Sequence, residues 1–586
     1  MKIGRRLCGL LLALGMFGTV FTEVQAAVAL PTGSNSEDIG AQIDAYVEEH
    51  EETTAGMSVS VFHGQETLYT GYFGYADKEQ GIPLTEESVV EWGSATKLFV
   101  WVSVMQLWEQ GKLDLEKDVR EYLPESFQDI FTYDTPITML HLMNHNAGFQ
   151  EVYADLFIKD AKDILPLEEA LLSHVPPQIF EPGTVAAYSN WGCALAGFVV
   201  EEVSGMSFAD YVHENIFKPL GMEHSALAAD LSDNPWVQEK RKELQCYMPD
   251  GTLIPDCFYY IGLYPAGMCT STLSDFETFG KALLAEDTPL FAKEETRQVL
   301  FTPSAYLGNT KVPSNYHGFW VLPYGVEVIG HGGNTAGCSS YLALSLENEI
   351  GLVVMTNQSS EGNYNGEMLE LVFGKYSTEE WFPQGREDWE GIFRPGRTIR
   401  KGPFKIMSLT YMMGEPERDD YWAAGNDGVE KVCYPYGDWV DVPVWEFVLE
   451  IALVLLWVLA VVISVISLLV KMIVKLVRLC KRKKNVVPLS WWSTLACVSQ
   501  LVMVLFIGVV ASQAFAYAPA YSYVGWIVAV VPMFILMLGL AIYGIMKIRK
   551  VELSKLCKVY NWMMVGGLLA SCANILYWNL FMWWLV

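Results

Sequence analysis

The sequence predicts an α+β domain, made of an antiparallel sheet and a helical part, followed by a small β-type module and four transmembrane helices. Two observations lead to this prediction. Strand patterns lie at both ends of residues 27–384 with helical patterns between them, so the two ends are expected to share one sheet. Four long apolar runs then fill residues 446–586, which indicates a membrane region.

The first elements in the chain are a strand pair and a buried helix. Residues 58–62 and 67–73 alternate around His63-Gly64-Gln65, which predicts a short antiparallel pair. Residues 98–108 are apolar on all sides, which is typical of a buried helix rather than a surface one. The N-terminal part of the domain is therefore expected to pass from sheet edge to helical core.

The later elements return to the sheet. Two helices are predicted at residues 192–203 and 207–216, separated by Ser204-Gly205. Three strands follow, and the last two form a hairpin around Glu347-Asn348-Glu349. These strands are predicted at residues 326–329, 340–346 and 350–355.

Charge separates the chain into an acidic body and an apolar end. The 586 residues are 51% hydrophobic and carry 39 Lys+Arg against 68 Asp+Glu, a formal charge of −29. Residues 27–445 hold 24 of these basic and 64 of these acidic side chains, so this part alone carries −40. A body of this charge does not bind nucleic acid by neutralising phosphates, and that class of partner is excluded.

The first 26 residues have the pattern of a secretory signal peptide. Lys2, Arg5 and Arg6 precede an apolar run at residues 7–20, and small-residue cleavage sites follow around Ala26. An uncleaved anchor helix is the alternative, although the run is short for a full span. In both cases the acidic body is expected to be exported.

Positive charges predict how the membrane region is oriented. Lys and Arg concentrate in the connections at residues 471–484 and 547–558, while residues 515–523 have none. The positive-inside bias places the two basic connections in the cytoplasm. We therefore expect a multi-pass cell-membrane protein with its acidic body outside. The four spans are predicted at residues 444–470, 491–514, 524–546 and 562–586.

Cysteine and histidine spacing predicts no metal site. His141 and His145 are four residues apart, as helix-borne ligands would be, but no third ligand accompanies them. Cys246 and Cys257 bracket a turn-like segment and either form a disulfide or remain free buried thiols.

The candidate nucleophile lies where the buried helix begins. In Ser94-Ala95-Thr96-Lys97, the spacing places the serine and the lysine on one face of a helix. A lysine in an apolar setting loses proton affinity and can accept a proton from the serine hydroxyl. Ser94 is the only serine in the chain with lysine three residues later. A partly buried structural lysine is the alternative.

Two more motifs carry groups suited to acyl transfer. Tyr188-Ser189-Asn190 follows a turn at residues 181–184, and a tyrosine beside a lysine cation can titrate below its usual pKa and act as an acid or base. The Asn190 amide can hold both Lys97 and a substrate carbonyl. His331-Gly332-Gly333 ends a predicted strand, and its glycines would let a substrate backbone lie along that edge.

In the order Ser-x-x-Lys, Tyr-x-Asn, His-x-Gly, these motifs resemble the serine beta-lactamase and penicillin-binding protein family, especially its class C beta-lactamase, D-Ala-D-Ala peptidase and esterase branch. The resemblance covers about residues 38–375 and implies a beta-lactamase/transpeptidase-like fold. It includes connecting segments as well as motifs, at residues 137–142, 147–149, 182–190, 219–222, 330–333 and 352–357.

The resemblance implies a mechanism residue by residue. Ser94 would form an acyl-enzyme while Lys97 and Tyr188 share the proton transfers, with no metal or organic cofactor. Asn190, His331, Gly332 and Gly333 would bind the substrate. The oxyanion hole would consist of the backbone N–H groups of Ser94 and Asn334. His331 stands where many lactamases of the family have lysine, so peptidase or esterase activity is expected rather than beta-lactam hydrolysis.

Composition changes again between the hydrolase-like part and the membrane region. Five cations cluster at Arg394, Arg397, Arg400, Lys401 and Lys405, and glycines and aromatic residues follow. We interpret residues 385–445 as a small β module or stalk, or as a linker that packs on the domain before it.

Two functions remain open from the sequence. The first is a membrane-anchored, outward-facing serine hydrolase that acts on cell-wall peptides containing D-Ala, on D-alanyl esters or on other small esters and amides. The second is a sensor that is acylated, or only binds its ligand, and acts through the spans. The complete set of catalytic residues favours the hydrolase, and the four spans, where one would anchor, favour the sensor.

Overall fold

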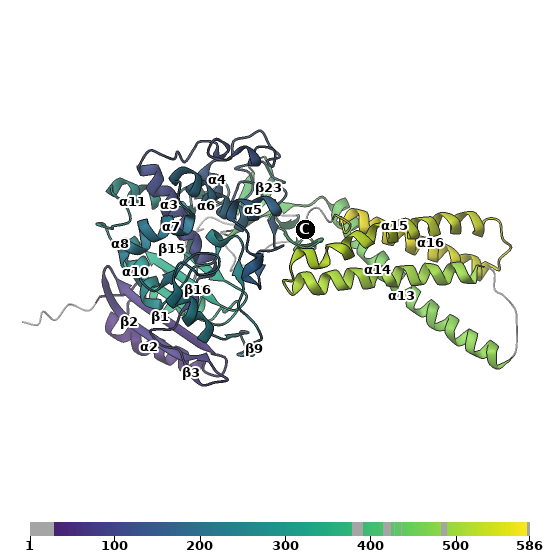
Figure 1. Cartoon of the computed structure of the whole chain (residues 1–586), viewed down its shortest axis with the longest axis horizontal. Coiled ribbons are helices and arrows are strands. Elements are labelled where there is room, and N and C mark those ends of the chain that lie inside the picture. Colours follow the sequence, from purple (N-terminus) through teal and green to yellow (C-terminus); the bar gives the residue numbers. More distant parts are fainter. Residues whose placement is uncertain are drawn as a thin grey trace, which may run out of the picture.

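The structure is a computed structural model that describes residues 28–377, 391–413, 423–426, 428–434, 436–481 and 489–582. The predicted signal peptide at residues 1–26 lies outside the described residues, as does most of the basic connection after residue 481. Figure 1 shows a sheet-and-helix body, residues 28–377, from which a helix bundle extends.

The described part of the body contains a nine-stranded antiparallel sheet that joins its two ends, as predicted. Strand β17 lies beside β1, with Val354 opposite Val59, so the last and first long strands are neighbours. The strand order is β12 (Ala305–Tyr306), β13 (Pro313–Tyr316), β14 (Phe319–Pro323), β15 (Glu327–Asn334), β16 (Ser339–Ser345), β17 (Ile350–Thr356), β1 (Gly56–His63), β2 (Glu66–Asp77) and β3 (Ile82–Pro83).

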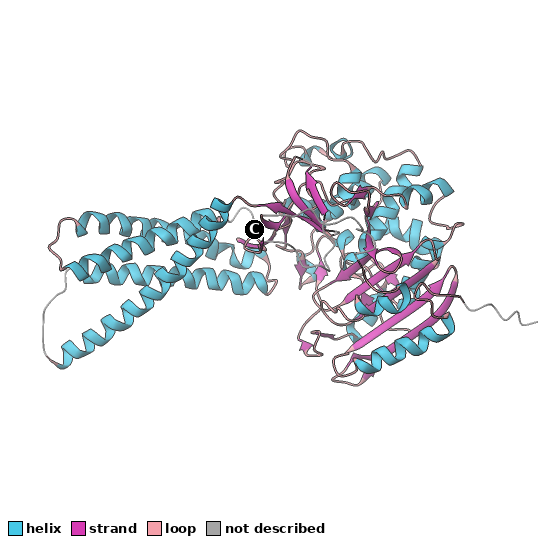
Figure 2. Ribbon diagram, turned by 180° about the vertical axis from the view of Figure 1, so that it is seen from behind, coloured by secondary structure: helices cyan, strands magenta, loops and turns pink. Residues whose placement is uncertain are grey.

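Helices cover both faces of this sheet. Alternate strand residues point to opposite sides, so Val353 and Met355 pack with helices α3 and α10, whereas Leu352 and Val354 pack with α2 and α12. Figure 2 shows a helix lying across the outer face of the sheet. These four helices are α2 (Ser36–Glu49), α3 (Lys97–Glu109), α10 (Leu273–Leu284) and α12 (Glu370–Phe373).

A helical part packs on the α3 side of the sheet. Its helices are α4 (Met139–Met143), α5 (Leu167–Ser173), α6 (Asn190–Ser204), α7 (Phe208–Val212), α8 (Lys218–Leu220), α9 (Pro235–Lys240) and α11 (Glu294–Leu300). The prediction of one helix at residues 207–216 was wrong in detail, because α7 continues through a π-helical turn into α8. Gly221 ends α8 in the left-handed region, at φ +69°.

Short strand pairs hold the loops of the body together. Cys246 and Cys257, the pair left open by the sequence, form a disulfide. The short strands are β4 (Val90–Glu91), β5 (Glu151–Val152), β6 (Phe157–Ile158), β7 (Ser225–Ala226), β8 (Cys246–Tyr247), β9 (Leu253–Ile254), β10 (Tyr260–Ile261) and β11 (Thr270–Ser271).

Strands also follow the body, in what we call the β module, residues 391–441. A hairpin of this module, β19 with β20, pairs in parallel with β5 of the body. The other described strands form one sheet in the order β21, β18, β24, β23, β22. The bounds are β18 (Ile392–Pro395), β19 (Ile399–Lys401), β20 (Phe404–Ile406), β21 (Met412–Met413), β22 (Ala423–Asn426), β23 (Glu430–Tyr434) and β24 (Gly437–Asp441).

Four helices in the described part of the chain are long and apolar enough to cross a membrane. They are α13 (Val444–Cys480), α14 (Ser490–Phe515), α15 (Ala520–Ile548) and α16 (Lys555–Tyr577). The fourth begins seven residues before the predicted run at 562, because Ser554 caps it by accepting a hydrogen bond from the Cys557 N–H. The prediction left out Lys555 and Lys558 because they are charged, but charged residues do not prevent a helix from starting.

The end of the bundle next to the body makes an apolar contact with it. Val152 and Ala154 pack with the C-terminal end of α14 and the N-terminal end of α15. The end of α13 at Cys480, the start of α14 at Ser490 and the connection at residues 549–554 lie at the opposite end of these helices. The body and the described basic residues that follow α13 and α15 are therefore at opposite ends of the bundle.

Candidate active site

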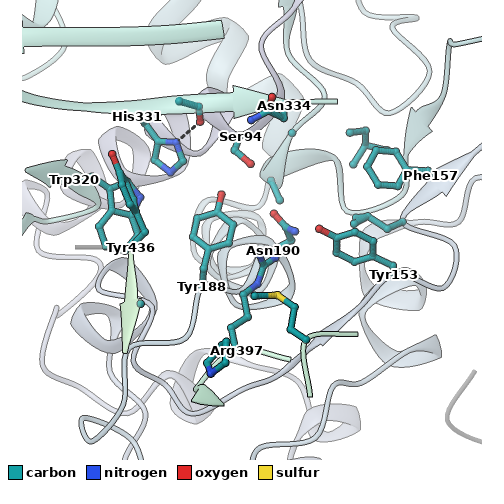
Figure 3. Close-up of a pocket in the computed structure, with 18 of the residues that line it drawn as sticks. Ser94, Tyr153, Phe157, Tyr188, Asn190, Trp320, His331, Asn334, Arg397 and Tyr436 are labelled. Atoms are coloured by element: carbon teal, nitrogen blue, oxygen red, sulfur yellow. Dashed lines mark hydrogen bonds between the residues drawn. The ribbon is translucent and has the colours of Figure 1, made fainter. Parts of the chain in front are cut away.

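A cavity of about 540 Å³ surrounds the predicted nucleophile, and we call it the Ser94 pocket. Three parts of the chain meet there: the helical part, strand β15 of the large sheet and the β module (Figure 3). It is lined by Ser94, Tyr153, Leu156, Phe157, Tyr188, Asn190, Ile261, Ala266, Gly267, Trp320, His331, Gly332, Asn334, Tyr341, Pro395, Arg397, Met407, Tyr436, Gly437, Asp438 and Trp439.

Ser94 lies in a 3₁₀ turn, Gly93–Thr96, directly before α3. This turn runs against the end of β15. A Cβ at Gly93 would lie 2.6 Å from the Asn334 nitrogen, and Gly93 has φ +54°, so glycine is required there on both counts. The close approach brings the backbone of Ser94 beside that of Asn334, which are the two residues predicted to form the oxyanion hole.

Lys97 is fully buried beneath the serine. Its Nζ donates hydrogen bonds to Ser94 Oγ at 2.9 Å, to Asn190 Oδ1 at 2.8 Å and to the Ala266 carbonyl at 2.6 Å. Burial lowers the pKa of Lys97 to about 8. A substantial fraction of the lysine is therefore neutral near pH 8 and able to accept the Ser94 proton.

Tyr188 lines the pocket, with its hydroxyl toward Ser94 (Figure 3). The Lys97 ammonium is 5.0 Å from the centre of its ring. The sequence suggested that Tyr188 titrates below its usual pKa, but burial raises the pKa of this phenol, and a hydrogen bond with Ser94 offsets only part of the effect. The tyrosine stays protonated and can donate a hydrogen bond or a proton.

Asn190 is the first residue of α6 and connects Lys97 with a buried acid. Its backbone N–H donates to Glu151 Oε2 at 2.7 Å, while its side-chain oxygen accepts from Lys97. Ser189 caps the helix by accepting a hydrogen bond from the Gly192 N–H. The helix start therefore determines where the Asn190 amide lies in the pocket.

Of the β15 residues predicted to bind the substrate, His331 and Gly332 line the pocket, and Gly333 is not among its lining residues. His331 Nδ1 lies 2.6 Å from the Gly332 carbonyl, and burial lowers the pKa of the imidazole to about 3, so the ring is neutral at pH 7. A Cβ at Gly333 would lie 1.7 Å from the Trp92 carbonyl, so glycine is required there for the packing of β15 against Trp92.

The two histidines considered as metal ligands have other partners. His141 Nδ1 accepts from the Thr138 N–H in the cap of α4. His145 accepts from the Ser189 N–H, and its ring stacks on Trp320 at 5.5 Å and lies 4.4 Å from that of Tyr188. Among the described residues, no group of three or more His, Cys, Asp or Glu could hold a metal ion.

Sequence reasoning missed the contribution of the β module to the pocket. Arg397 was noted only as one of five clustered cations, yet its guanidinium carbon lies 4.9 Å from the centre of the Tyr188 ring. Tyr436 contacts Trp320, at 5.4 Å between ring centres. The buried Glu151 was also missed, since no motif marks it. Charge clustering was the one available signal, and it does not indicate which cation reaches the pocket.

The fold and this geometry define the class of protein. A Ser-x-x-Lys turn opens a buried helix beside strand β15 of an antiparallel sheet, with a Tyr-x-Asn segment facing it. This is the arrangement of penicillin-recognising serine hydrolases. The chain belongs to the Beta-lactamase family, whose model matches residues 43–374.

Curated relatives and a solved structure are similar to the chain. A penicillin-binding protein of Bacillus subtilis is 27% identical over 338 residues, or 54% of this chain and 72% of that protein. A D-aminopeptidase of Gluconobacter oxydans is 26% identical over 328 residues, or 52% of this chain and 56% of that protein. The octameric penicillin-binding protein homologue from Pyrococcus abyssi has a TM-score of 0.49 at 21% identity, over 69% of this chain and 99% of that one.

Proposed function

We propose that this protein is a membrane-bound serine hydrolase that forms an acyl-enzyme on Ser94. One observation carries the proposal: Ser94 Oγ faces the pocket and lies 2.9 Å from the amine of a fully buried lysine that has no carboxylate hydrogen-bonded to it in the described part of the chain. An amine in this setting is a suitable base for a serine hydroxyl.

The chemistry follows from these protonation states. Neutral Lys97 takes the Ser94 proton as Oγ bonds to the carbonyl carbon of an ester or amide, and the backbone N–H groups of Ser94 and Asn334 stabilise the oxyanion. As the bond to the leaving group breaks, Tyr188 donates its proton to that group and recovers one from Lys97. Water then attacks the ester on Ser94 and gives a proton to the amine of Lys97. The Ser94 Oγ–acyl bond breaks, the acid product leaves, and Lys97 returns the proton to Ser94 Oγ.

The neutral imidazole of His331 supports esters and amides over beta-lactams as substrates. At this position it offers a hydrogen-bonding nitrogen but no charge. We propose D-Ala peptides of the cell wall, D-alanyl esters or other esters of the cell envelope. Similarity to a penicillin-binding protein and to a D-aminopeptidase supports this range.

We also propose that the body lies outside the cytoplasm, after a cleaved signal peptide at residues 1–26. The body and the described basic residues at the ends of α13 and α15 lie at opposite ends of the bundle, and basic connections tend to stay in the cytoplasm. In this proposal, residues 27–384 form the hydrolase domain, 385–445 the accessory module and 446–586 the membrane domain.

Labelling of the serine tests the proposal. The full chain in detergent is treated with a fluorophosphonate and with a fluorescent penicillin, beside Ser94→Ala, and the adduct is located by mass spectrometry. We expect labelling of Ser94 in the wild type and none in the variant, with turnover of a D-Ala peptide or a simple ester. No labelling of folded wild-type protein would contradict the hydrolase.

The sensor remains the second candidate because four helices form the membrane region where one would anchor the body. A sensor would give a Ser94 adduct that persists for hours without product. Measuring the lifetime of the adduct by intact mass separates it from the hydrolase.

A further inference from the structure

The β module is attached to the two body segments that carry active-site groups. Strand β19 pairs in parallel with β5, which contains Glu151. The carboxylate of Asp438 accepts from the Ala186 N–H at 2.8 Å, and the Asp438 N–H donates to the Ala186 carbonyl at 2.8 Å, two residues before Tyr188. The module therefore determines the positions of both segments.

Arg397 extends from this module into the pocket (Figure 3). It contacts one side chain from each of these segments, Glu151 and Tyr188. Its Nη2 lies 3.3 Å from Glu151 Oε2, and its guanidinium carbon lies 4.9 Å from the centre of the Tyr188 ring. The Tyr188 ring thus lies near two cations, Lys97 and Arg397.

Glu151 is fully buried, and a buried carboxylate is costly unless it is paired and hydrogen-bonded. Its Oε2 accepts a hydrogen bond from the Asn190 N–H and forms an ion pair with Arg397. Its Oε1 has no hydrogen-bond partner among the described residues. Docking of the module alone does not require this acid, because the Gln150 side chain already binds Thr398 and the Gly396 carbonyl beside it. The acid lies where it affects Asn190 and, through it, Lys97.

We propose that Arg397 and Glu151 form a positioning pair that holds Tyr188 and Asn190 in place and balances the charge around Lys97, which makes the β module part of the active site. This inference rests on the proposed acylation of Ser94. Arg397 acts through Tyr188 and Glu151 acts through Asn190, and neither needs to touch the reacting atoms.

The two members of the pair act on Lys97 in opposite directions. Burial is the main cause of its lowered pKa; the Glu151 carboxylate raises the pKa, and the Arg397 cation lowers it. The thiol of Cys193 on α6 also raises it. The charged and titratable groups that face Lys97 from the surrounding elements are Cys193, Tyr188, Glu151, Arg397, His145 and His331.

The pH dependence of acylation tests the pair. The rate of Ser94 labelling by a fluorophosphonate is measured in the full chain in detergent from pH 5 to pH 10. The acid limb is the part of this profile in which the labelling rate rises with pH. Glu151→Gln keeps the shape of the side chain and removes a negative charge, so the acid limb should move to lower pH. Arg397→Met removes a positive charge, so the limb should move to higher pH. We expect shifts of about half to one pH unit, with a several-fold fall in the maximal rate.

Two further variants separate positioning from simple docking. Thr398→Val removes the hydroxyl that binds Gln150 and keeps the backbone hydrogen bond from the Glu151 N–H to the carbonyl of residue 398, so it should leave the limb in place. Arg397→Lys keeps the charge and should restore the limb while recovering part of the rate. Thermal unfolding verifies that each variant folds. If Arg397→Met does not fold, the isosteric Glu151→Gln still tests the proposal.

The outcomes are distinct from those for the proposed function. Absence of wild-type labelling refutes the hydrolase itself. Normal wild-type labelling, with both charge variants leaving the limb in place or moving it in the same direction, refutes the positioning pair alone.

Discussion

The ring of Tyr517, in the connection between α14 and α15, lies 4.6 Å from the ring of Phe157, which lines the Ser94 pocket. Tyr259 contacts the same tyrosine at 5.4 Å, and the Asp155 carboxylate accepts a hydrogen bond from the Ala520 N–H at 3.0 Å. One wall of the pocket therefore packs against the connection between α14 and α15.

Removal of this support should weaken binding at the pocket. We predict that Tyr517→Ala raises KM for a small ester substrate about threefold to tenfold and changes kcat less, because an aromatic pair contributes about 0.5–1.5 kcal/mol beyond its buried area. Steady-state kinetics of the full chain measure this change. Tyr521→Ala is the matched control, since that side chain is 70% exposed. Equal effects of the two substitutions would show that the contact with Phe157 has no role.

Local sequence patterns predicted the residues at the centre of the site and the sheet beside it. Ser94 and Lys97 were found because they are three residues apart at the start of a helix that is apolar on all sides. The sheet was predicted because strands at both ends of the body need partners, and β17 does lie beside β1. The raised pKa of Tyr188 could not be anticipated, because it depends on burial by segments distant in the sequence.

The contribution of the β module lay beyond such reasoning. Arg397 is about 300 residues from Ser94 in the sequence, and nothing local distinguishes it from Arg394, which pairs instead with Glu446 and Glu450 of α13. Glu151 could not be recognised for the same reason, because the sequence does not distinguish a buried acid in a short strand from an acid on the surface. Tertiary docking alone places these side chains.

The lowered pKa of Lys97 predicts how acylation depends on pH. Because the neutral amine is the base, the rate of Ser94 labelling should rise with pH and reach half its maximum near pH 8. Lys97→Arg keeps a cation that does not lose its proton, so we expect a loss of at least about 100-fold at all pH values. Stopped labelling reactions followed by mass spectrometry give the rates. Lys112→Arg, at an exposed turn after α3, should behave as wild type.

The buried neutral His331 predicts sensitivity to acid. Its pKa in the folded protein is about 3, below the value of about 6.5 expected in the unfolded chain. The unfolded state therefore takes up the proton first, so the stability that this group contributes is complete above pH 6.5 and is lost as the pH falls toward 3. His331→Gln, which does not titrate, should flatten the decrease in Tm over that range. An unchanged slope in the His331 variant would contradict this reading of its burial.

Glu450 connects the β module to two helices of the bundle. This acid of α13 is 2% exposed and is hydrogen-bonded to Arg394 at 3.2 Å, to the Tyr577 hydroxyl of α16 at 2.8 Å and to Tyr411. Glu450→Gln keeps the shape but removes the charge, so we predict a loss of about 1–3 kcal/mol in the free energy of unfolding.

Thermal unfolding of the full chain in detergent measures this loss, and Glu446→Gln is its control. Glu446 also pairs with Arg394, at 2.9 Å, but its side chain is 24% exposed, so water replaces much of the lost interaction and the decrease in Tm should be small. Because the acid connects the module to the bundle, the Glu450 variant should also lose labelling of Ser94 at a lower temperature than wild type. If Ser94 labelling is lost at a temperature unrelated to the unfolding temperature of the bundle, the network does not couple the membrane region to the active site.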